Sequence, residues 1–464
     1  MATPIMWIGL LYAVICLAIQ FQEHKQAKGD DCFPYDQHKG NCDQVHFYRE
    51  KIVLCLLAGN YTQPGQYTAE TLLVYFLVEH LHAKETKIGT WVLLGTIIRL
   101  AMRMGFHRDP RHSPMISPFQ GEMRRRLWCQ IALYDHLFSS QVGLPEMITK
   151  SACDCEEPRN IWDDDLQEEM TELPIAQPDS ILIPVMHITV LNKMISVSSK
   201  IFELALTTQT ISYSTVIDLD KELQDARAAV PAGLQMCPLP ELFNDSPEIM
   251  VLRIHIDTRY HYARCILHRR YLMPAYEAAH YAYSRSCCIE SAIQLAHYQS
   301  ILHREMQPNG RLPFFRWAMA STLDHIFLVA STILCVDLYQ DLISSQSSGS
   351  DKTNSRVKKL QTLETILPLW SKASQQSNGA RRVTEAISLV IWRAAQMGIV
   401  GSPSNSERED LRQAQPDNSS DTMHAMSAIS GLPLANIDDP VCILQSISSP
   451  QYAQVDLQQH TQSV

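Results

Sequence analysis

The sequence predicts an all-α protein: a large array of antiparallel helices followed by a disordered C-terminal tail. Three observations predict this fold class. Apolar residues recur every three or four positions in one segment after another, which is the period of an amphipathic helix. The strict alternation that marks a half-buried strand is nearly absent. From residue 401 onward the composition changes.

The composition allows a large core and argues against autonomous nucleic-acid binding. The chain has 464 residues, of which 46% are hydrophobic and 19% charged, enough for one large domain or two ordinary ones. Its net charge is −10, whereas a compact domain that binds DNA by itself is usually basic. The thirteen cysteines have no framework spacing, so we expect mostly buried free thiols in a reducing compartment.

The first apolar segment, residues 5–19, has three interpretations: a signal peptide, a membrane anchor or a buried core helix. It is shorter than the roughly 20 residues of a spanning helix. No Lys or Arg precedes it, so the basic region of a signal peptide is missing. We therefore expect a core helix. A polar loop (25–41) follows, then three further predicted helices: 44–58, 68–82 and 91–103.

The middle of the chain carries the clearest signals for helix ends. Gly105 lies where a left-handed C-terminal cap belongs, and Pro110 prevents the helix from continuing. Ser117 is a natural N-cap, Pro118 fits the first helical position and Gln120 completes a capping-box pattern. A helix, a loop and a second helix are therefore predicted here. Gly143 and Pro145 end the second helix.

Three consecutive arginines, Arg124, Arg125 and Arg126, lie in this second helix. They fall about 100° apart around it, so they cannot all face one partner. We expect at least one to pair near the core with a carboxylate such as Glu122 or Asp135. The alternatives are a solvated helix face and a contact with phosphate or DNA. Ion pairing is favoured because acidic residues are interleaved with the bases.

The remainder of the chain predicts more helices, one linker and the tail. An acidic surface loop is expected over 158–178 and a Ser-rich linker near 344–354. Further helices are expected in six segments: 181–207, 217–229, 250–272, 316–342, 357–370 and 381–397. The tail, 401–464, has eight Asp or Glu against two Arg and no Lys, a composition typical of disorder.

The tail also contains a candidate activation segment, in which apolar residues alternate with polar ones around two aspartates. Acidic residues keep such side chains in water and available to a partner's groove. Pro433 and Pro440 oppose one continuous helix, so we expect binding through short turns. An inert tail is the alternative. The candidate residues are Leu432, Leu434, Asp438, Asp439, Ile443 and Leu444.

Motifs of catalysis or metal binding are missing or incomplete, so we assign no catalytic, metal or cofactor residue. There is no Cys-x-x-Cys, and the pair Cys153 and Cys155 is too tight for a zinc knuckle. One enzymatic alternative, a class I terpene synthase, is raised by the acidic run 164–168, which has the form of a magnesium-binding motif. The run 244–248 fails the spacing of the second motif that such enzymes need.

Several segments together resemble the regulatory middle homology domain of fungal zinc-cluster transcription factors. The resemblance covers about residues 1–400, with further landmarks at 267–272 and 287–292. Its motifs are Gly105-Phe106-His107-Arg108-Asp109, Glu122-Met123-Arg124-Arg125-Arg126-Leu127-Trp128 with Asp135, Gly143-Leu144-Pro145, and Pro158-Arg159-Asn160-Ile161-Trp162-Asp163.

The resemblance implies a nuclear regulator of RNA polymerase II transcription, not an enzyme and not a membrane protein. Its implied partners are a coactivator or a related transcription factor, in a dimer with it. DNA would be reached only through a zinc-cluster module or a partner. The family's six-cysteine zinc cluster is not in this sequence. Either the protein has no DNA-reading module or an upstream part is lost; the alternative function is a co-regulator that does not bind DNA.

Overall fold

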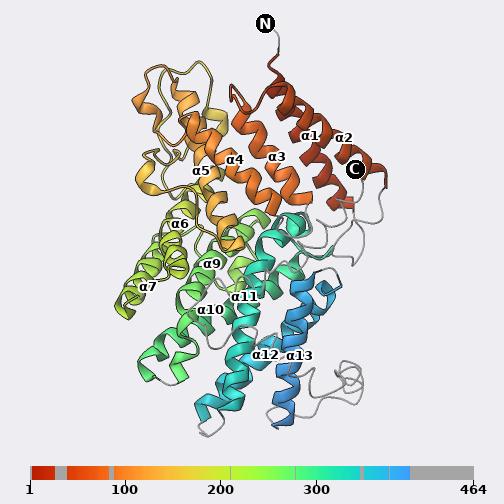
Figure 1. Ribbon diagram of the computed structural model, residues 1–464, viewed down its shortest axis with the longest axis vertical. Coiled ribbons are helices and arrows are strands. Elements are labelled where there is room, and N and C mark those ends of the chain that lie inside the picture. Colours follow the sequence, from red (N-terminus) through yellow and green to blue (C-terminus); the bar gives the residue numbers. More distant parts are fainter. Residues whose placement is uncertain are drawn as a thin grey trace, which may run out of the picture. The chain divides into compact units, whose positions relative to one another are not determined.

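A computed structural model describes residues 3–26, 39–82, 88–209, 211–276, 278–344, 350–375 and 377–397 (Figure 1). Within these ranges every regular element is helical and no strand occurs, which confirms the predicted all-α class. The candidate activation segment and the rest of the predicted tail lie outside the described residues. The α-helices are α1 (Ile5–Gln26), α2 (Lys39–Ala58), α3 (Thr68–His82), α4 (Ile88–Arg103), α5 (Pro118–Val142), α6 (Pro184–Leu206), α7 (Tyr213–Ala228), α8 (Leu239–Leu242), α9 (Pro247–His268), α10 (Ala282–Glu305), α11 (Arg316–Ile343), α12 (Ser350–Ala373) and α13 (Asn378–Gln396).

Short 3₁₀ turns lie between several of these helices. Three of them belong to the motif region or the loops beside it, and four lie in the second half of the chain. They are η1 (Pro110–His112), η2 (Lys150–Ala152), η3 (Asp163–Asp165), η4 (Arg269–Tyr271), η5 (Pro274–Tyr276), η6 (Ala279–Tyr281) and η7 (Pro313–Phe315).

The chain divides into two compact units that do not follow sequence order. Unit 1 comprises Met1–Glu203, Ile211–Arg264 and His297–Phe327, and unit 2 comprises Leu204–Thr210, Cys265–Ala296 and Leu328–Val464. Sequence reasoning did not foresee this division, because it depends on which helices pack together. The predicted boundary near residue 400 stays a prediction.

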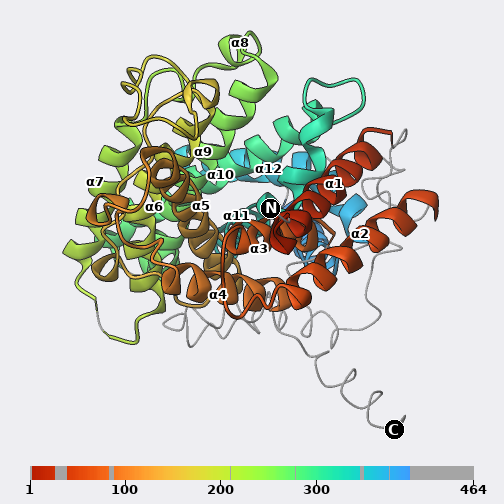
Figure 2. The same cartoon turned by 90° about the horizontal axis from the view of Figure 1, so that it is seen from above.

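Unit 1 begins with a helical array in which α1 packs against α2 and α3, α3 against α4, and α4 against α5 (Figures 1 and 2). The α1–α2 pair is antiparallel, since Cys55 near the end of α2 lies beside Gly9 near the start of α1, whereas Val45, nearer the start of α2, contacts Cys16 in the middle of α1. Thr71 of α3 donates a hydrogen bond to the carbonyl of Met6 over 2.8 Å. The predicted antiparallel hairpins are therefore present in this unit.

Helix α1 is a core helix on one face only. Met6, Ala13 and Cys16 are buried, whereas Trp7 and Val14 are 42% and 50% exposed. By length and composition two helices, α1 and the later part of α11, pass the test for a membrane span, a test that core helices also pass. The packing of α1 against α2 and α3 supports the expected core helix for its buried face.

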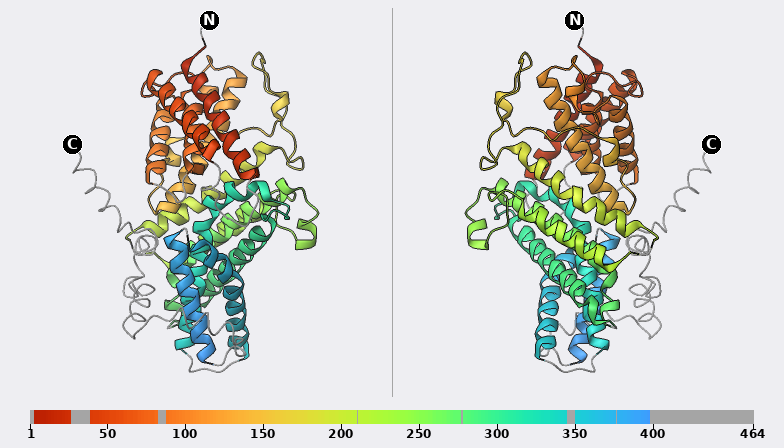
Figure 3. Two further views of the ribbon diagram at one scale, coloured as in Figure 1. Left: turned by 90° about the vertical axis from the view of Figure 1, so that its right-hand side faces the viewer. Right: turned by 90° about the vertical axis from the view of Figure 1, so that its left-hand side faces the viewer.

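Unit 2 contains α12 and α13, which lie side by side in both views of Figure 3. Leu334 and Leu338 of α11, Leu363 and Ile366 of α12, and Val390 of α13 are buried. These side chains supply an apolar core, which is the main source of stability for such a helical unit.

Several boundaries differ from the sequence expectations. Helix α12 begins at Ser350, so the expected linker near 344–354 is shorter, and residues 345–349 lie outside the described part. The expected loop 25–41 loses residues at both ends to α1 and α2. Helix α9 ends at His268 and continues into the turn η4. Helix ends depend on local packing that periodicity does not report.

Candidate functional site

The motif region starts where α4 ends. Gly105 has a φ of 81°, and the backbone amide of Phe106 donates to the carbonyl of Ala101 over 3.0 Å. This is the left-handed cap predicted for Gly105, since glycine adopts positive φ without a steric penalty. Asp109 then caps the turn η1 by accepting a hydrogen bond from the Arg111 amide over 3.0 Å.

Asp109 is the centre of the first ion pair. Its buried carboxylate receives Nε and Nη2 of Arg125 over 2.9 and 2.8 Å, a two-pronged pair. The backbone amide of Glu156 donates to the same carboxylate over 3.0 Å. Burial by itself raises the pKa of Asp109, but the bonds from Arg125 and the two amides hold it well below its usual range. Asp109 is thus ionised and ties three segments together.

Glu122 is the centre of the second ion pair. Arg126 donates through Nε to Glu122 over 3.0 Å and through Nη2 to the carbonyl of Ile161 over 3.0 Å. The amide of Arg159 also donates to Glu122 over 3.2 Å. Asp163, on the surface, is a further partner of Arg126. The predicted pairing between an arginine of the run and Glu122 is confirmed.

The third arginine of the run, Arg124, contacts the end of α4 instead. Its guanidinium lies 4.9 Å from the centre of the Phe106 ring and donates to the carbonyl of Met104 over 3.4 Å. The three arginines therefore point to three different partners, as their spacing around the helix predicts. We call Asp109, Glu122, Arg125 and Arg126 the carboxylate clamp.

Asp135 corrects one expectation. It is buried but does not pair with an arginine of the run; its Oδ2 accepts the backbone amides of Met147 and Ile148 over 2.9 and 2.7 Å. Burial raises the pKa of Asp135 to about 6, partly offset by these amides. The arginines all have partners nearer the start of α5. Asp135 therefore holds the loop after α5 through its backbone amides and does not form an ion pair with the arginine run.

The remaining motif residues position the same loops. Gly143 ends α5 in the left-handed conformation, with a φ of 69°, and Pro145 follows in the loop that Asp135 holds. Trp128 is buried, and its ring lies 6.2 Å from the ring of His107. Arg108 forms a surface ion pair with Asp154 over 3.0 Å. The structure thus places every predicted motif residue in α5 or in the loops next to it.

Residues that the metal and enzyme alternatives need do not fit those roles. Cys153 and Cys155 flank Asp154, and the carboxylate of Asp154 forms an ion pair with Arg108. The pair supplies only two thiols, whereas the family's zinc cluster needs six cysteines. The described part of the chain therefore offers no fit for the family's zinc cluster at this pair. The acidic run 164–168 begins with Asp164 and Asp165, which lie exposed in the turn η3.

Sequence reasoning missed a buried charged cluster in unit 2. Lys359 is only 1% exposed at its side chain and donates to Asp337 over 2.6 Å and to Asp341. Arg285 donates to the same two carboxylates over 2.6 and 2.8 Å. We call Arg285, Asp337, Asp341 and Lys359 the buried tetrad. Its two positive and two negative charges cancel, and its members are too far apart in sequence to be paired by inspection.

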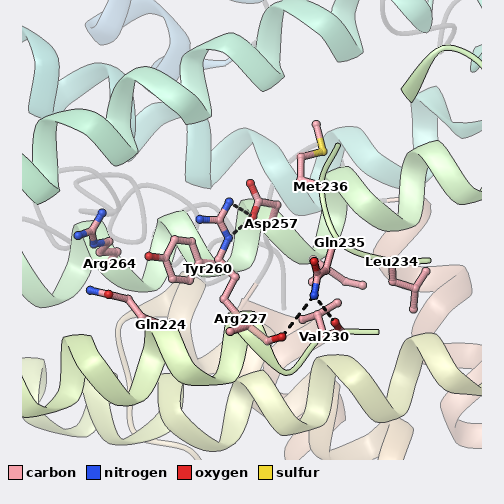
Figure 4. A pocket seen from close by; sticks show the side chains of 11 residues that line it. Gln224, Arg227, Val230, Leu234, Gln235, Met236, Asp257, Tyr260 and Arg264 are labelled. Atoms are coloured by element: carbon pink, nitrogen blue, oxygen red, sulfur yellow. Dashed lines mark hydrogen bonds and ion pairs between the residues drawn. The ribbon is translucent and has the colours of Figure 1, made fainter. Parts of the chain in front are cut away.

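A second missed feature is a pocket of about 440 Å³ in unit 1 (Figure 4). It lies between the end of α7, the loop that follows and the helix α9. One end carries the polar side chains of Gln224, Arg227, Tyr260 and Arg264, and the other carries the apolar side chains of Val230, Leu234 and Met236 (Figure 4). Its size is that of small-molecule sites. The only sequence signal was the break in helical pattern after residue 229.

Comparison with known proteins places the chain. Residues 8–228 match the fungal specific transcription factor domain. The chain is 41% identical to the Zn(2)-C6 fungal-type transcription factor pigI of Monascus ruber, an alignment that covers 86% of this chain and 49% of that protein. It is 35% identical to the pyrrolocin cluster transcription factor fsdR of a fungal species, covering 88% and 54%. No solved structure matches the chain.

A third relative, the transcription factor cghF of Chaetomium globosum, is 31% identical over 83% of this chain and 67% of its own length. The chain thus spans about half to two thirds of the length of these relatives. All three are named as transcription factors, which argues against the terpene synthase alternative. The chain belongs to the family of fungal-specific transcription factors.

Proposed function

We propose that this chain is the regulatory part of a nuclear, non-catalytic transcription factor. In this proposal residues 1–400 act as the regulatory domain, and DNA is reached through a separate zinc-cluster module or a protein partner. The name of one relative, the pyrrolocin cluster transcription factor fsdR, supports regulation of the genes of one cluster. A coactivator or a related factor, in a dimer with this chain, is the proposed protein partner.

One observation carries the proposal: the arginine run is used inside the protein. Arg125 and Arg126 are only 11% and 15% exposed at their side chains, and their guanidinium groups bind Asp109 and Glu122. A DNA contact would require these groups to leave buried carboxylates uncompensated, which costs several kcal/mol. The net charge of −10 adds a general repulsion from phosphate.

The first test measures DNA binding by the purified chain. Fluorescence anisotropy with labelled duplexes from promoters of the source genome, at physiological salt, should show only weak binding that does not depend on sequence. Arg125→Gln and the exposed-site control Arg108→Gln should both bind DNA as weakly as the parent. Nanomolar, sequence-dependent binding by the chain alone would overturn the proposal.

The second test concerns the activation segment. Residues 401–464, fused to a heterologous DNA-binding domain, should activate a reporter gene. Replacing Leu432, Leu434, Ile443 and Leu444 with Ala should abolish the activation, because those apolar side chains would enter the coactivator groove. Activation that survives the four replacements, or none from the parent segment, would remove this assignment and leave the regulatory domain proposal intact.

A further inference from the structure

The pocket in unit 1 has a polar end in which two arginine side chains are each held by a buried aspartate, one of which, Asp257, also lines the pocket. Nε and Nη2 of Arg227 each lie 2.7 Å from Oδ1 of Asp257, a carboxylate that is buried. The guanidinium of Arg227 also lies over the ring of Tyr260, 4.4 Å from its centre. These contacts fix the orientation of the guanidinium before any ligand arrives, which reduces the entropy lost on binding.

Arg227 keeps donor capacity for a ligand. Its side chain is 41% exposed, and a guanidinium has five N–H donors, of which Asp257 occupies those on one edge. The third nitrogen points away from Asp257, on the side of Tyr260 and Arg264 (Figure 4). A planar fork of this kind matches a carboxylate better than a single ammonium does.

Asp257 is not itself the recognition group, because its charge is already compensated. Beside Arg227 it receives the hydroxyl of Tyr298 and the ring of His261, 3.2 Å away. These contacts keep the pKa of Asp257 lowered in spite of its burial. An incoming cation would find no free carboxylate there, whereas an incoming anion meets a half-exposed guanidinium.

A second guanidinium reinforces this end of the pocket. Nε of Arg264 donates over 3.0 Å to Asp220, a carboxylate buried behind the pocket wall. Arg227 and Arg264 therefore reach the same cavity from α7 and α9, each anchored by its own aspartate. One negative charge placed between them gains from both arginines while the anchoring pairs stay intact.

The opposite end of the pocket fits an apolar body. Val230 and Leu234 line it and are almost fully buried. Gln235 lies at the same end, where its side-chain amide is already used by the carbonyls of Ala228 and Val230. Met236 lines the same end and has the flexible thioether chain that adapts to ligands of different shape. We propose that this pocket binds a small monocarboxylic acid with an aliphatic or aromatic body, as an effector of the regulator. The role of this acid as an effector rests on the proposed function, whereas its binding to the pocket does not.

The test compares three probes with one tail and different heads: decanoate, decanamide and decylamine. Isothermal titration of the full chain, below the concentration at which decanoate self-associates, should show one saturable site per chain for decanoate. The amide should bind at least about 10-fold more weakly, because it lacks the charge-assisted bonds to arginine. The amine should bind most weakly. Equal affinities for all three, or no saturable decanoate binding, would overturn the proposal.

Two variants and one control locate the site. Ala228→Phe, on the exposed rim of the pocket, should block decanoate by volume alone, and Arg227→Gln should erase the preference for decanoate over decanamide. Arg304→Gln, whose side chain is 63% exposed and lies outside the pocket lining, should change neither. Should Arg227→Gln unfold in a thermal melt, Ala228→Phe decides: unchanged decanoate affinity there overturns the pocket assignment.

This outcome is separable from the proposed function. A chain that fails to bind decanoate but still controls a reporter gene contradicts the pocket alone. A chain that binds decanoate as described, yet also binds DNA specifically on its own, contradicts the proposed function alone.

Discussion

The carboxylate clamp and the buried tetrad are both made of two acids and two bases, but they stabilise different things. In the clamp each carboxylate also accepts backbone amides: Asp109 takes those of Arg111 and Glu156, and Glu122 takes that of Arg159. The clamp therefore orders irregular loops against α5. Lys359 and Arg285 of the tetrad instead join side chains of three helices, α10, α11 and α12.

The difference explains why such charges persist in an interior. A buried ion pair by itself is weak evidence of stability, because desolvation offsets the attraction. Loop amides, however, need acceptors once the loop is packed against a helix, and a carboxylate can serve several at once. The carboxylate clamp thus consists of two acceptors for loop amides, Asp109 and Glu122, and the two arginines that neutralise their charge. The two carboxylates of the tetrad accept the side-chain hydroxyl of Tyr276 from the turn η5, over 3.1 and 2.8 Å, but no loop amide among the described residues. Its variants should therefore behave mainly as losses of ion pairing.

The largest effect is expected from the tetrad. Lys359→Met should lower the free energy of unfolding by about 5 kcal/mol, because it leaves Asp337 and Asp341 with one cation between them. Chemical denaturation measures the loss. Lys358→Met, exposed on the same helix, is the matched control and should stay within about 0.5 kcal/mol of the parent. Equal effects at both positions would show that the tetrad is not buried as described.

The next effect is expected from the apolar support of the clamp. Trp128→Ala should cost about 4 kcal/mol, since a buried indole is removed and a cavity remains. Trp162→Ala, at a ring that is 43% exposed, should cost much less. Thermal melts of both variants test this. If Trp128→Ala melts like the parent but loses a protein partner, α5 is an interface and the structural interpretation is wrong.

Asp135 and Asp109 should give opposite pH dependences. The pKa of Asp135 is raised to about 6, so its ionisation destabilises the fold as pH rises from about 4 to 7. Relative to Asp135→Asn, the parent should lose about 3 kcal/mol over that range. The lowered pKa of Asp109 works the other way: its stabilisation is present above its unfolded pKa and is lost as pH falls.

Denaturation of the parent and of Asp135→Asn at several pH values checks the first sign. The same series with Asp109→Asn checks the second. If the parent instead becomes more stable relative to Asp135→Asn as pH rises, the ionised carboxylate of Asp135 must have a cationic partner, which would contradict this prediction.

The smallest effect is expected at the rim of the clamp. Asp163→Asn should change stability by less than about 1 kcal/mol, because its side chain is 79% exposed and its pair with Arg126 is screened by solvent. Raising the salt concentration should remove even that difference. A loss as large as that of Trp128→Ala would mean that Arg126 depends on Asp163 more than on Glu122.

Much of the fold was predictable because its signals are local. Helix α3 has the predicted bounds, and Ser117, Pro118 and Gly143 occupy their predicted cap positions. The Glu122 pair was also predictable, since Arg126 lies one helical turn away. Each of these depends on residues within a few positions of one another.

What could not be predicted depends on which helices meet. The partner of Asp135 is a loop that folds back after α5, so no spacing rule points to it. The sequence gives no sign that Lys359 is buried, because it stands next to Lys358 in a polar stretch. Only the packing of α12 buries Lys359 and leaves Lys358 exposed. The pocket at Arg227 needs Asp257 from another helix, thirty positions away.

The most direct test of the clamp is a double-mutant cycle at Asp109 and Arg125. Asp109→Asn, Arg125→Gln and the double variant are unfolded by denaturant beside the parent. The structure predicts strong coupling, toward the upper end of the roughly 0.5–3 kcal/mol range for contacting residues, because either single change strands a buried charge. If the losses of the two single variants add up to that of the double variant within about 0.5 kcal/mol, Asp109 and Arg125 are not coupled. That result would contradict the claim that the arginine run forms ion pairs inside the protein.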